Sequence, residues 1–361
     1  MSERVNYKLN LKKDAGGSWL YAYGLLAGRE KLFFDESQLQ QLINTHSEAE
    51  FLNLIQSANY SGETVEEALI NSQQADLDLI CSIVPDYALL ELFLQFNDAH
   101  NLKVFLRTIL PAQESILIKD IEYLFLRPYL TEPQDILSAV RNFSKNSYTD
   151  SGLITDFDIK DLQVPDWFEE TIQQAEKIYL ETYDMGRVDL VVEQALWQEL
   201  VKRLSEIKSD WLTEYYLLKA DLINLEILLR CKNISLSKEF FQRSILSQGN
   251  LSQTQWLDLF SFDNLKLAGK IKLSGFGDFS EIAEIYHQPG SASIFSQLAD
   301  CRLMQKIKET KYFASGIEKV AAYYLVREME RRNIRLIRAC HLNSIPHERA
   351  YQIIRPSYAG V

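Results

Sequence analysis

The sequence predicts an all-helical protein. Only 8 Pro and 14 Gly interrupt 361 residues, which favours long helices over short strands joined by turns. Apolar residues recur at spacings of three and four through most of the chain, and the alternation typical of a strand is weak everywhere, with Lys270 to Leu273 the one short candidate. The hydrophobic share of 47% is ordinary for a globular chain that buries a core.

In the first third of the chain, apolar spacing and helix breakers predict a series of helices. Two are expected at Tyr21–Leu32 and Leu39–Ile43, and Ser47 is a plausible N-cap for a third. The segment Tyr87–Leu110 is a long amphipathic pattern ended by a proline, and Ile116–Leu126 stops shortly before the next proline.

Two boundaries are expected farther along. The polar segment 144–165 is the best linker, and Asp166 after it is a plausible N-cap with Glu169 in capping-box position. The glycine-rich segment 268–278 is the second boundary candidate. The remaining helices are expected at 166–208 (one helix, or two with a break near Gly186), 211–232, 316–340 and a short stretch after Pro346.

Charge and cysteine content narrow the class of protein. A net charge of −12 argues against a general nucleic-acid binder, because affinity for phosphate backbones depends on Lys and Arg. Residues 325–361 hold seven Arg against three Glu, about +4, which leaves about −16 for the rest. The four cysteines are far apart, no stretch approaches 18 uncharged apolar residues, and the N-terminus lacks a secretory pattern, so we expect a cytoplasmic protein.

A repeat is the most informative feature of the sequence. Residues 97–107 and 219–230 share one pattern. In each, an Asn follows an acid by three residues, a Leu comes directly after the Asn, and an Arg follows the Leu by five residues. A looser third copy lies at 327–338. The corresponding residues are Asp98, Asn101, Leu102 and Arg107 in the first copy, Asp221, Asn224, Leu225 and Arg230 in the second, and Glu330, Asn333 and Ile334 in the third, where Arg338 comes one residue early.

Helical geometry places the acid, the Asn and the Leu of each copy on one helix face. Lys103 and Arg107 form an adjacent stripe, in which Glu226 and Arg230 make a favourable pair in the second copy. Two interpretations stay open. The polar residues bridge neighbouring helices inside each domain, or three equivalent helices line a common surface.

The repeated frame D-x-x-N-L-K-x-x-L-R occurs together with the motifs YAYGLLAGREKL, SANYSG and IRLIRACHLNSIP. In these motifs the chain resembles the C-type subunits of V/A-type rotary ATPases, which are homologous to the d-type subunits of the eukaryotic V-ATPases. The resemblance extends from about Trp19 to Arg355. It implies three similar helical domains around a pseudo-threefold axis, forming a funnel; we expect them at residues 1–145, 146–268 and 269–361.

The resemblance also implies a function. Members of this family sit on the cytoplasmic face of the rotor ring, accept the central D–F shaft, and transmit torque for ion transport without binding nucleotide or another cofactor. We expect the ring and the shaft as partners, and the basic C-terminal region would suit an acidic partner surface. The candidate partner-binding residues are Asn101, Lys103, Arg107, Asn224, Arg230, Arg331, Arg332, Arg335 and Arg338.

Catalytic motifs are missing from the sequence. It has no HExxH, no phosphate-binding GxxxxGK[ST] and no GxSxG, and no two cysteines have metal-ligand spacing, so we expect neither an enzyme nor a metal site. A terpenoid-synthase-like enzyme would need an acidic metal cluster, and Asp76 and Asp78 fall on different helix faces. A generic helical scaffold remains the alternative, although solenoids repeat every 34 to 47 residues and this chain repeats every 109 to 123.

Overall fold

The computed structural model describes residues 17–111, 117–144, 163–313 and 316–359. The described residues form helices joined by turns and contain no β-strand, which confirms the all-helical prediction. The chain divides into two compact units, and each is described by itself. The described residues of the first unit are 87–111, 117–144 and 163–208, and the second unit combines residues 14–86 with residues 209–361.

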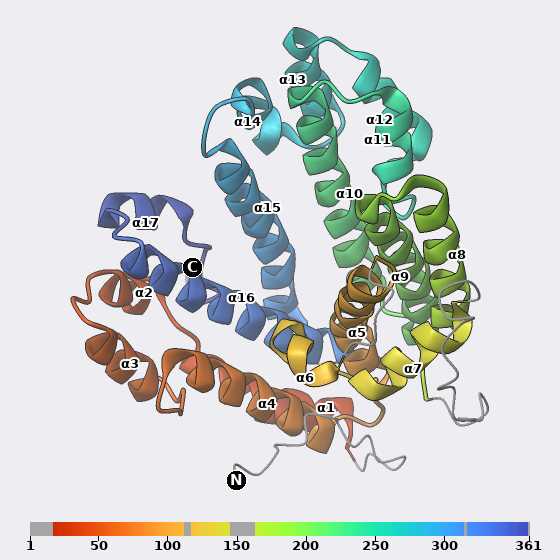
Figure 1. The fold of residues 1–361 in the computed structure, drawn as a ribbon. Helices are drawn as coiled ribbons and strands as arrows, with labels where there is room; N and C mark the ends of the chain where they lie inside the picture. Colours follow the sequence, from red (N-terminus) through yellow and green to blue (C-terminus); the bar gives the residue numbers. More distant parts are fainter. Residues whose placement is uncertain (1–16, 112–116, 145–162, 314–315, 360–361) are drawn as a thin grey trace. The chain divides into compact units, whose positions relative to one another are not determined.

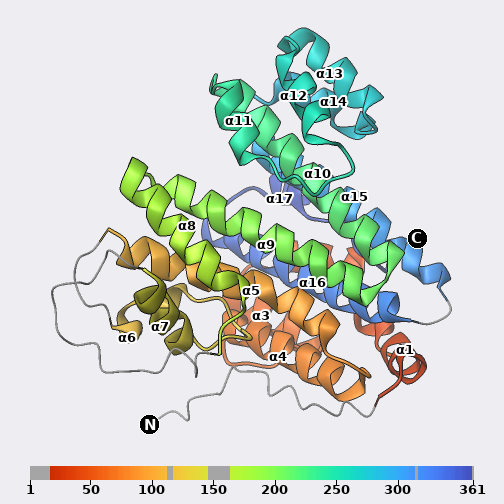
Figure 2. The ribbon, with the colours of Figure 1, turned by 90° about the vertical axis from the view of Figure 1, so that its right-hand side faces the viewer.

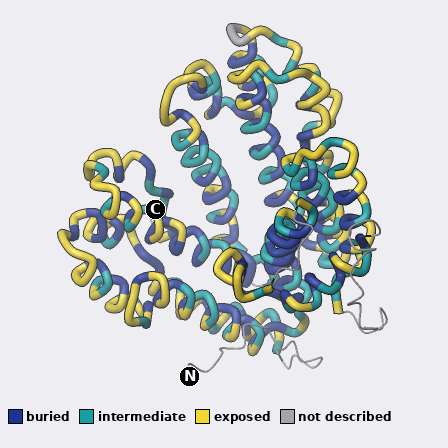
Figure 3. The backbone as a smooth tube through the Cα atoms, viewed as in Figure 1, coloured by how far each residue is buried: buried dark blue, intermediate teal, exposed yellow. Residues whose placement is uncertain are grey.

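The first unit is built on one long, almost completely buried helix. Helix α5 (Ala88–Ile109) is apolar on most of its circumference, as expected of a helix at the centre of a core. Its buried residues pack with residues of α7, α8 and α9 in one cluster. Figure 3 colours the backbone of these buried residues dark blue. The helices of this unit are α5, α6 (Ile118–Ile121), η2 (Glu122–Leu124), α7 (Pro133–Phe143), α8 (Trp167–Thr182) and α9 (Met185–Ile207).

The break expected near Gly186 is present between α8 and α9. Tyr183 lies in the left-handed region with a φ of 52°, and the Asp184 carboxylate caps the new helix by accepting a hydrogen bond from the Gly186 amide at 2.9 Å. The two helices then run side by side, as both ribbon views show (Figures 1 and 2). Segment 166–208 is therefore two helices.

The second unit brings together residues from both ends of the sequence. The helices from its first part are α1 (Trp19–Ala27), η1 (Glu30–Leu32), α2 (Glu36–Ile43), α3 (Glu48–Ser57) and α4 (Val65–Ile83). From its second part come α10 (Asp210–Asn233), α11 (Lys238–Ser244), α12 (Gln253–Ser261), α13 (Asn264–Leu273), η4 (Gly277–Phe279), α14 (Ser280–Ile285), α15 (Ser291–Lys308), η5 (Glu309–Tyr312), α16 (Ile317–Leu342) and α17 (His347–Ile353).

The core of this second unit joins α2, α3 and α4 to α16 and α17. Buried apolar residues such as Leu42, Phe51 and Ile55 pack in one cluster with Ile334 and Ile337. Figure 1 shows the red and orange helices of residues 19–83 beside the blue helices α16 and α17. No described helix is long and apolar enough to cross a membrane.

Two local predictions are wrong. Residues 270–273, the strand candidate, are the end of α13, because Asp263 caps that helix by accepting from the Lys266 amide at 2.9 Å and Leu267 and Ile271 are buried one turn apart. Asp166 precedes α8 as expected but makes no capping bond, since its φ of −54° and ψ of −34° are helical and not extended.

Other predicted features agree with the structure. The Ser47 hydroxyl caps α3 by accepting from the Glu50 amide at 3.2 Å. Most of the polar linker, residues 145–162, lies outside the described residues, and so does the first expected domain boundary at 145/146. The second boundary, at 268/269, falls inside α13. The division into three domains stays a prediction.

Candidate functional site

The asparagines of the repeat bind the backbone of a later segment. The Asn101 amide donates to the Leu126 carbonyl oxygen at 3.1 Å, and its oxygen accepts from the Leu126 amide at 2.9 Å. Asn224 makes the same two bonds with Leu246, at 2.8 and 2.7 Å. Both asparagine side chains are completely buried. We call this pair of hydrogen bonds the asparagine tie.

The third copy has the same tie. Asn333 donates to the Arg355 carbonyl oxygen at 3.0 Å and accepts from the Arg355 amide at 2.8 Å. The tied residue follows its asparagine by 25 positions in the first copy and by 22 in the other two. The degenerate third copy therefore keeps the role of its asparagine.

The acids of the first two copies anchor the segment just beyond the tie. The Asp98 carboxylate accepts from the Leu130 and Thr131 amides, both at 3.0 Å, and from the Thr131 hydroxyl at 2.6 Å. Asp221 accepts from the amide of Asn250 at 2.8 Å and from its side chain at 2.9 Å. Each anchored segment leads into the next helix, α7 or α12. The acid and the asparagine thus fix one helix-to-helix connection at two points.

Burial raises the pKa of Asp98 to about 6, and the hydrogen bonds from Thr131 and Leu130 act in the opposite direction by stabilising the ionised form. Burial also raises the pKa of Asp221. These carboxylates are internal anchors in this structure, since both residues are buried.

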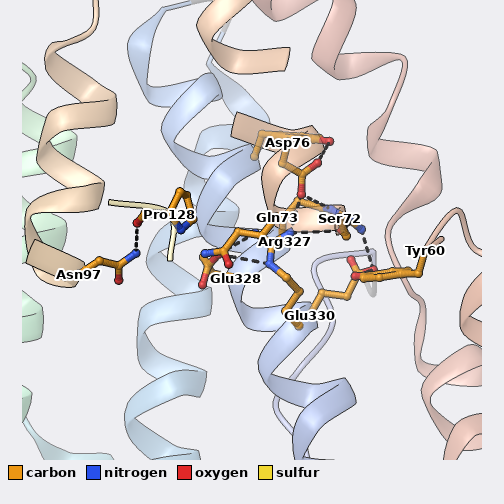
Figure 4. Close-up of polar contacts among 11 residues, drawn as sticks. Tyr60, Ser72, Gln73, Asp76, Asn97, Pro128, Arg327, Glu328 and Glu330 are labelled. Atoms are coloured by element: carbon orange, nitrogen blue, oxygen red, sulfur yellow. Dashed lines mark hydrogen bonds and ion pairs between the residues drawn. The ribbon is translucent and has the colours of Figure 1, made fainter. Parts of the chain in front are cut away.

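The acid of the third copy binds elsewhere. Glu330 accepts from the Tyr60 hydroxyl and from the Arg327 guanidinium, each at 2.9 Å (Figure 4). Burial raises the pKa of Glu330, while Arg327 acts to lower it. The N-terminal part of the unit supplies Tyr60, so this acid ties α16 to the loop after α3.

Glu330 belongs to a buried ionic network between α4 and α16. The Asp76 carboxylate accepts from Arg327 at 2.9 Å (Figure 4). It also accepts from Arg331 at 2.6 Å and from the Tyr323 hydroxyl at 2.8 Å. The Arg331 side chain is completely buried, and it also pairs with Glu328 at 2.6 Å. Because a buried charge without its partner is very costly, this network holds the two helices in one arrangement.

Three of the predicted partner-binding residues are therefore internal. Asn101, Asn224 and Arg331 are completely buried and bonded within the chain, so they offer no surface to a partner in this structure. Their contacts favour the first interpretation of the repeat, in which polar residues bridge elements inside a unit.

The charged residues beside the asparagines on the same helices also form ion pairs within the chain. Lys103 pairs with Glu193 at 2.7 Å, and Arg107 binds Asp189 through two nitrogens, so α5 is held to α9. Arg230 makes the expected pair along α10 with Glu226, at 2.6 Å, and 62% of its side chain stays exposed. Arg107 and Arg230 remain accessible for partner contact.

The remaining candidate arginines of α16, which are exposed or partly exposed, have carboxylate partners as well. Arg332 binds Asp300 at 2.8 Å, and the other two bind acids on the N-terminal helices: Arg335 pairs with Glu66 at 3.2 Å and Arg338 with Glu48 at 2.7 Å. The excess positive charge of residues 325–361 is thus largely balanced inside the second unit. Sequence reasoning did not find these acids, because they lie 32 to 290 positions away.

The structure gives no support to the alternative of an enzyme with an acidic metal cluster. Within the described ranges, no group of three or more His, Cys, Asp or Glu side chains is placed to hold a metal ion. Asp76, one of the two acids weighed for such a cluster, is bonded to arginines.

These features define a class: an all-helical protein with a repeated internal tie, in which polar residues fix the connections between helices. A family model described as ATP synthase (C/AC39) subunit matches residues 22–353, and the chain belongs to this family. The chain is thus a member of a family of V/A-type ATP synthase subunits. A comparison with curated protein sequences finds no match.

Proposed function

We propose that this chain is a non-catalytic coupling subunit of a V/A-type rotary ATPase. It joins the rotating D–F shaft to the membrane rotor ring on the cytoplasmic side and passes torque between them for ion transport. The family match over residues 22–353 is the observation that carries this proposal. A generic helical scaffold remains the alternative.

The internal bonding of the chain suits such a role. A torque-bearing body must resist bending at the connections between helices, which are usually the softest parts of a helical protein. Here asparagine ties hold the connection between η2 and α7, the connection between α11 and α12, and the segment that follows α17, and the buried ionic network joins α16 to α4. These contacts support a stiff adapter.

A binding experiment tests the proposal. The tagged chain is mixed at low salt with the purified D–F shaft and, separately, with detergent-solubilised rotor ring. An unrelated acidic helical protein with the same tag is the control for charge-driven adsorption. We expect both partners to be retained by the chain and not by the control. If circular dichroism shows a folded helical chain that retains neither partner, the coupling role is wrong.

A further inference from the structure

The three asparagine ties hold corresponding points of three short helical segments. In each copy the tied residue lies two positions after the end of a short helix: Leu126 after η2, Leu246 after α11 and Arg355 after α17. The residue five positions before the tied residue is buried in all three copies, as Ile121, Phe241 and Ala350. The three segments can therefore be compared position by position.

The tied residue is covered in two copies and exposed in the first. Leu246 is 2% exposed and Arg355 is 7% exposed, whereas Leu126 is 45% exposed. The last residue of the short helix shows the same difference, since it is buried in the second and third copies and is Leu124, 40% exposed, in the first. The first copy thus exposes two leucines at positions that are covered in the second and third copies.

Leu124 and Leu126 form a small apolar surface with Tyr123, which is 81% exposed. Phe125 between the two leucines has extended backbone and is buried, with its ring centroid 5.1 Å from that of Phe105. Because side chains alternate along extended backbone, both leucines lie on the side away from this core contact. We call Tyr123, Leu124 and Leu126 the apolar patch. Large apolar side chains that are exposed together are typical of a surface that another molecule covers.

Polar residues of α5 hold the backbone under the apolar patch. A ring nitrogen of His100 lies 3.0 Å from the Leu124 carbonyl oxygen, and the residue that Asn101 ties follows two positions later. The Asn97 side chain donates to the Pro128 carbonyl oxygen at 2.7 Å, a bond drawn in Figure 4. The patch is therefore held in one position before a partner arrives, so that binding needs little ordering of the backbone.

The third copy shows which kind of element covers a tied segment. Helix α15 lies on it, and the Gln297 side chain of this helix donates to the Ile354 carbonyl oxygen at 3.0 Å. Asp300 and Ser296, also of α15, accept from Arg355 at 2.7 and 2.9 Å. These three side chains of α15 share one helix face. A helix therefore fits the corresponding place in the first copy, where the exposed side chains are apolar and require an apolar stripe in place of polar residues.

The charge next to the apolar patch is balanced. Glu122 accepts from Arg127 at 2.5 Å, and the exposed neighbours Lys119 and Asp120 carry opposite charges. Residues 117–127 hold two cations and two acids, which gives a net charge of zero in a chain of net charge −12. Contact with a partner is therefore stabilised by burial of apolar side chains rather than by opposite charge.

We propose that the apolar patch docks one helix of the D–F shaft, through an uncharged apolar stripe of that helix, in the place that α15 occupies in the third copy. A rotor ring repeats one surface around its axis, so a surface matched to it would be expected in more than one copy of the repeat. The apolar patch is exposed in one of the three tied segments, which suits a partner that is present once. The inference deepens the proposed function and rests on it, because the shaft is a partner only in that role.

The test compares two double variants, each in an exposed tyrosine and leucine of the first unit. Tyr123→Asn with Leu124→Gln alters the patch. Tyr183→Asn with Leu180→Gln is the control, since Tyr183 is 75% exposed and Leu180 is 44% exposed. Binding of the full chain and of both variants to the purified shaft and to the solubilised ring is measured. We expect the patch variant to bind the shaft at least about ten-fold more weakly, at low and at high salt alike, because salt does not screen apolar contacts. Its ring binding, and all binding by the control variant, should be unchanged.

The outcomes separate this inference from the proposed function. Shaft binding by the patch variant that is as tight as by the control, or equal weakening of both, overturns the inference and leaves the coupling role standing. A folded, unmodified chain that binds neither shaft nor ring overturns both.

Photo-cross-linking tests the contact without removing it, and it needs no folded patch variant. Benzoylphenylalanine replaces Tyr123 in the full chain bound to shaft and ring, and the same replacement of Tyr183 is the control. We expect cross-links from position 123 to a helix of the shaft and none to the shaft from position 183. Cross-links from position 123 to ring subunits, to a second copy of this chain or to no protein overturn the inference.

Discussion

Replacing Asn224 with alanine should destabilise the second unit strongly. The side chain is completely buried, and it supplies both hydrogen bonds of the Leu246 backbone at 2.8 and 2.7 Å. Leu246 is itself 2% exposed, so water cannot replace the lost bonds. Leaving a buried donor and a buried acceptor unsatisfied costs about 1–3 kcal/mol each, and we therefore expect a loss of about 3 kcal/mol in the free energy of unfolding.

The assay is urea denaturation followed by circular dichroism, with Asn53→Ala as the matched control. Asn53 is exposed on α3, so its replacement by alanine removes no buried hydrogen bond. Asn224→Asp adds a second test, because it keeps an acceptor for the Leu246 amide but places a carboxylate oxygen against the Leu246 carbonyl. It should be at least as destabilising as alanine. A loss below about 1 kcal/mol for Asn224→Ala would refute the reasoning, because even one unsatisfied buried group costs that much.

Three other results are expected. Asn101→Ala and Asn333→Ala should each lower the free energy of unfolding to within about 1 kcal/mol of the Asn224→Ala effect, because all three make the same pair of bonds; an effect confined to one copy would contradict the equivalence of the ties. Arg331→Met should lower the free energy of unfolding by about 3–5 kcal/mol, because it leaves Asp76 without one of its buried partners. The added change Asp76→Asn should recover part of this loss. Arg332→Met is the control: the Arg332 side chain is 59% exposed, and its replacement should lower the free energy of unfolding by less than about 1 kcal/mol. The stability of the wild type relative to Asp98→Asn should fall as pH rises from about 4 to about 6, because folding raises the pKa of Asp98 from 3.8 to about 6 and the folded state then holds more protons in that range; equilibrium unfolding at several pH values checks this, and a rise would contradict it.

The helical class and the limits of some long helices could be predicted from local pattern. Apolar spacing and sparse prolines located α5 and α10 to within two residues, and the repeat marked the acid and asparagine that later proved to be buried. Local pattern was wrong at residues 270–273, where burial of Leu267 and Ile271 on one helix face determines the structure.

The partners of the repeat could not be predicted. The spacing of Asp98 and Asn101 predicts that they share a helix face. The residues that they bind, however, are 25 to 33 positions later, in a segment with no regular apolar spacing. The link from Asp76 to Arg331 joins residues 255 positions apart, and it forms only because α4 and α16 pack together. Such long-range pairs depend on the tertiary fold and leave no local signal.

The most direct test of the coupling role is a bridging measurement. The rotor ring is immobilised in detergent, and retention of the D–F shaft is measured with and without this chain. We predict that the shaft is retained only when the chain is present, in equal amounts of chain and shaft. Equal retention of the shaft without the chain, or release of the chain from the ring when the shaft is added, would contradict the account.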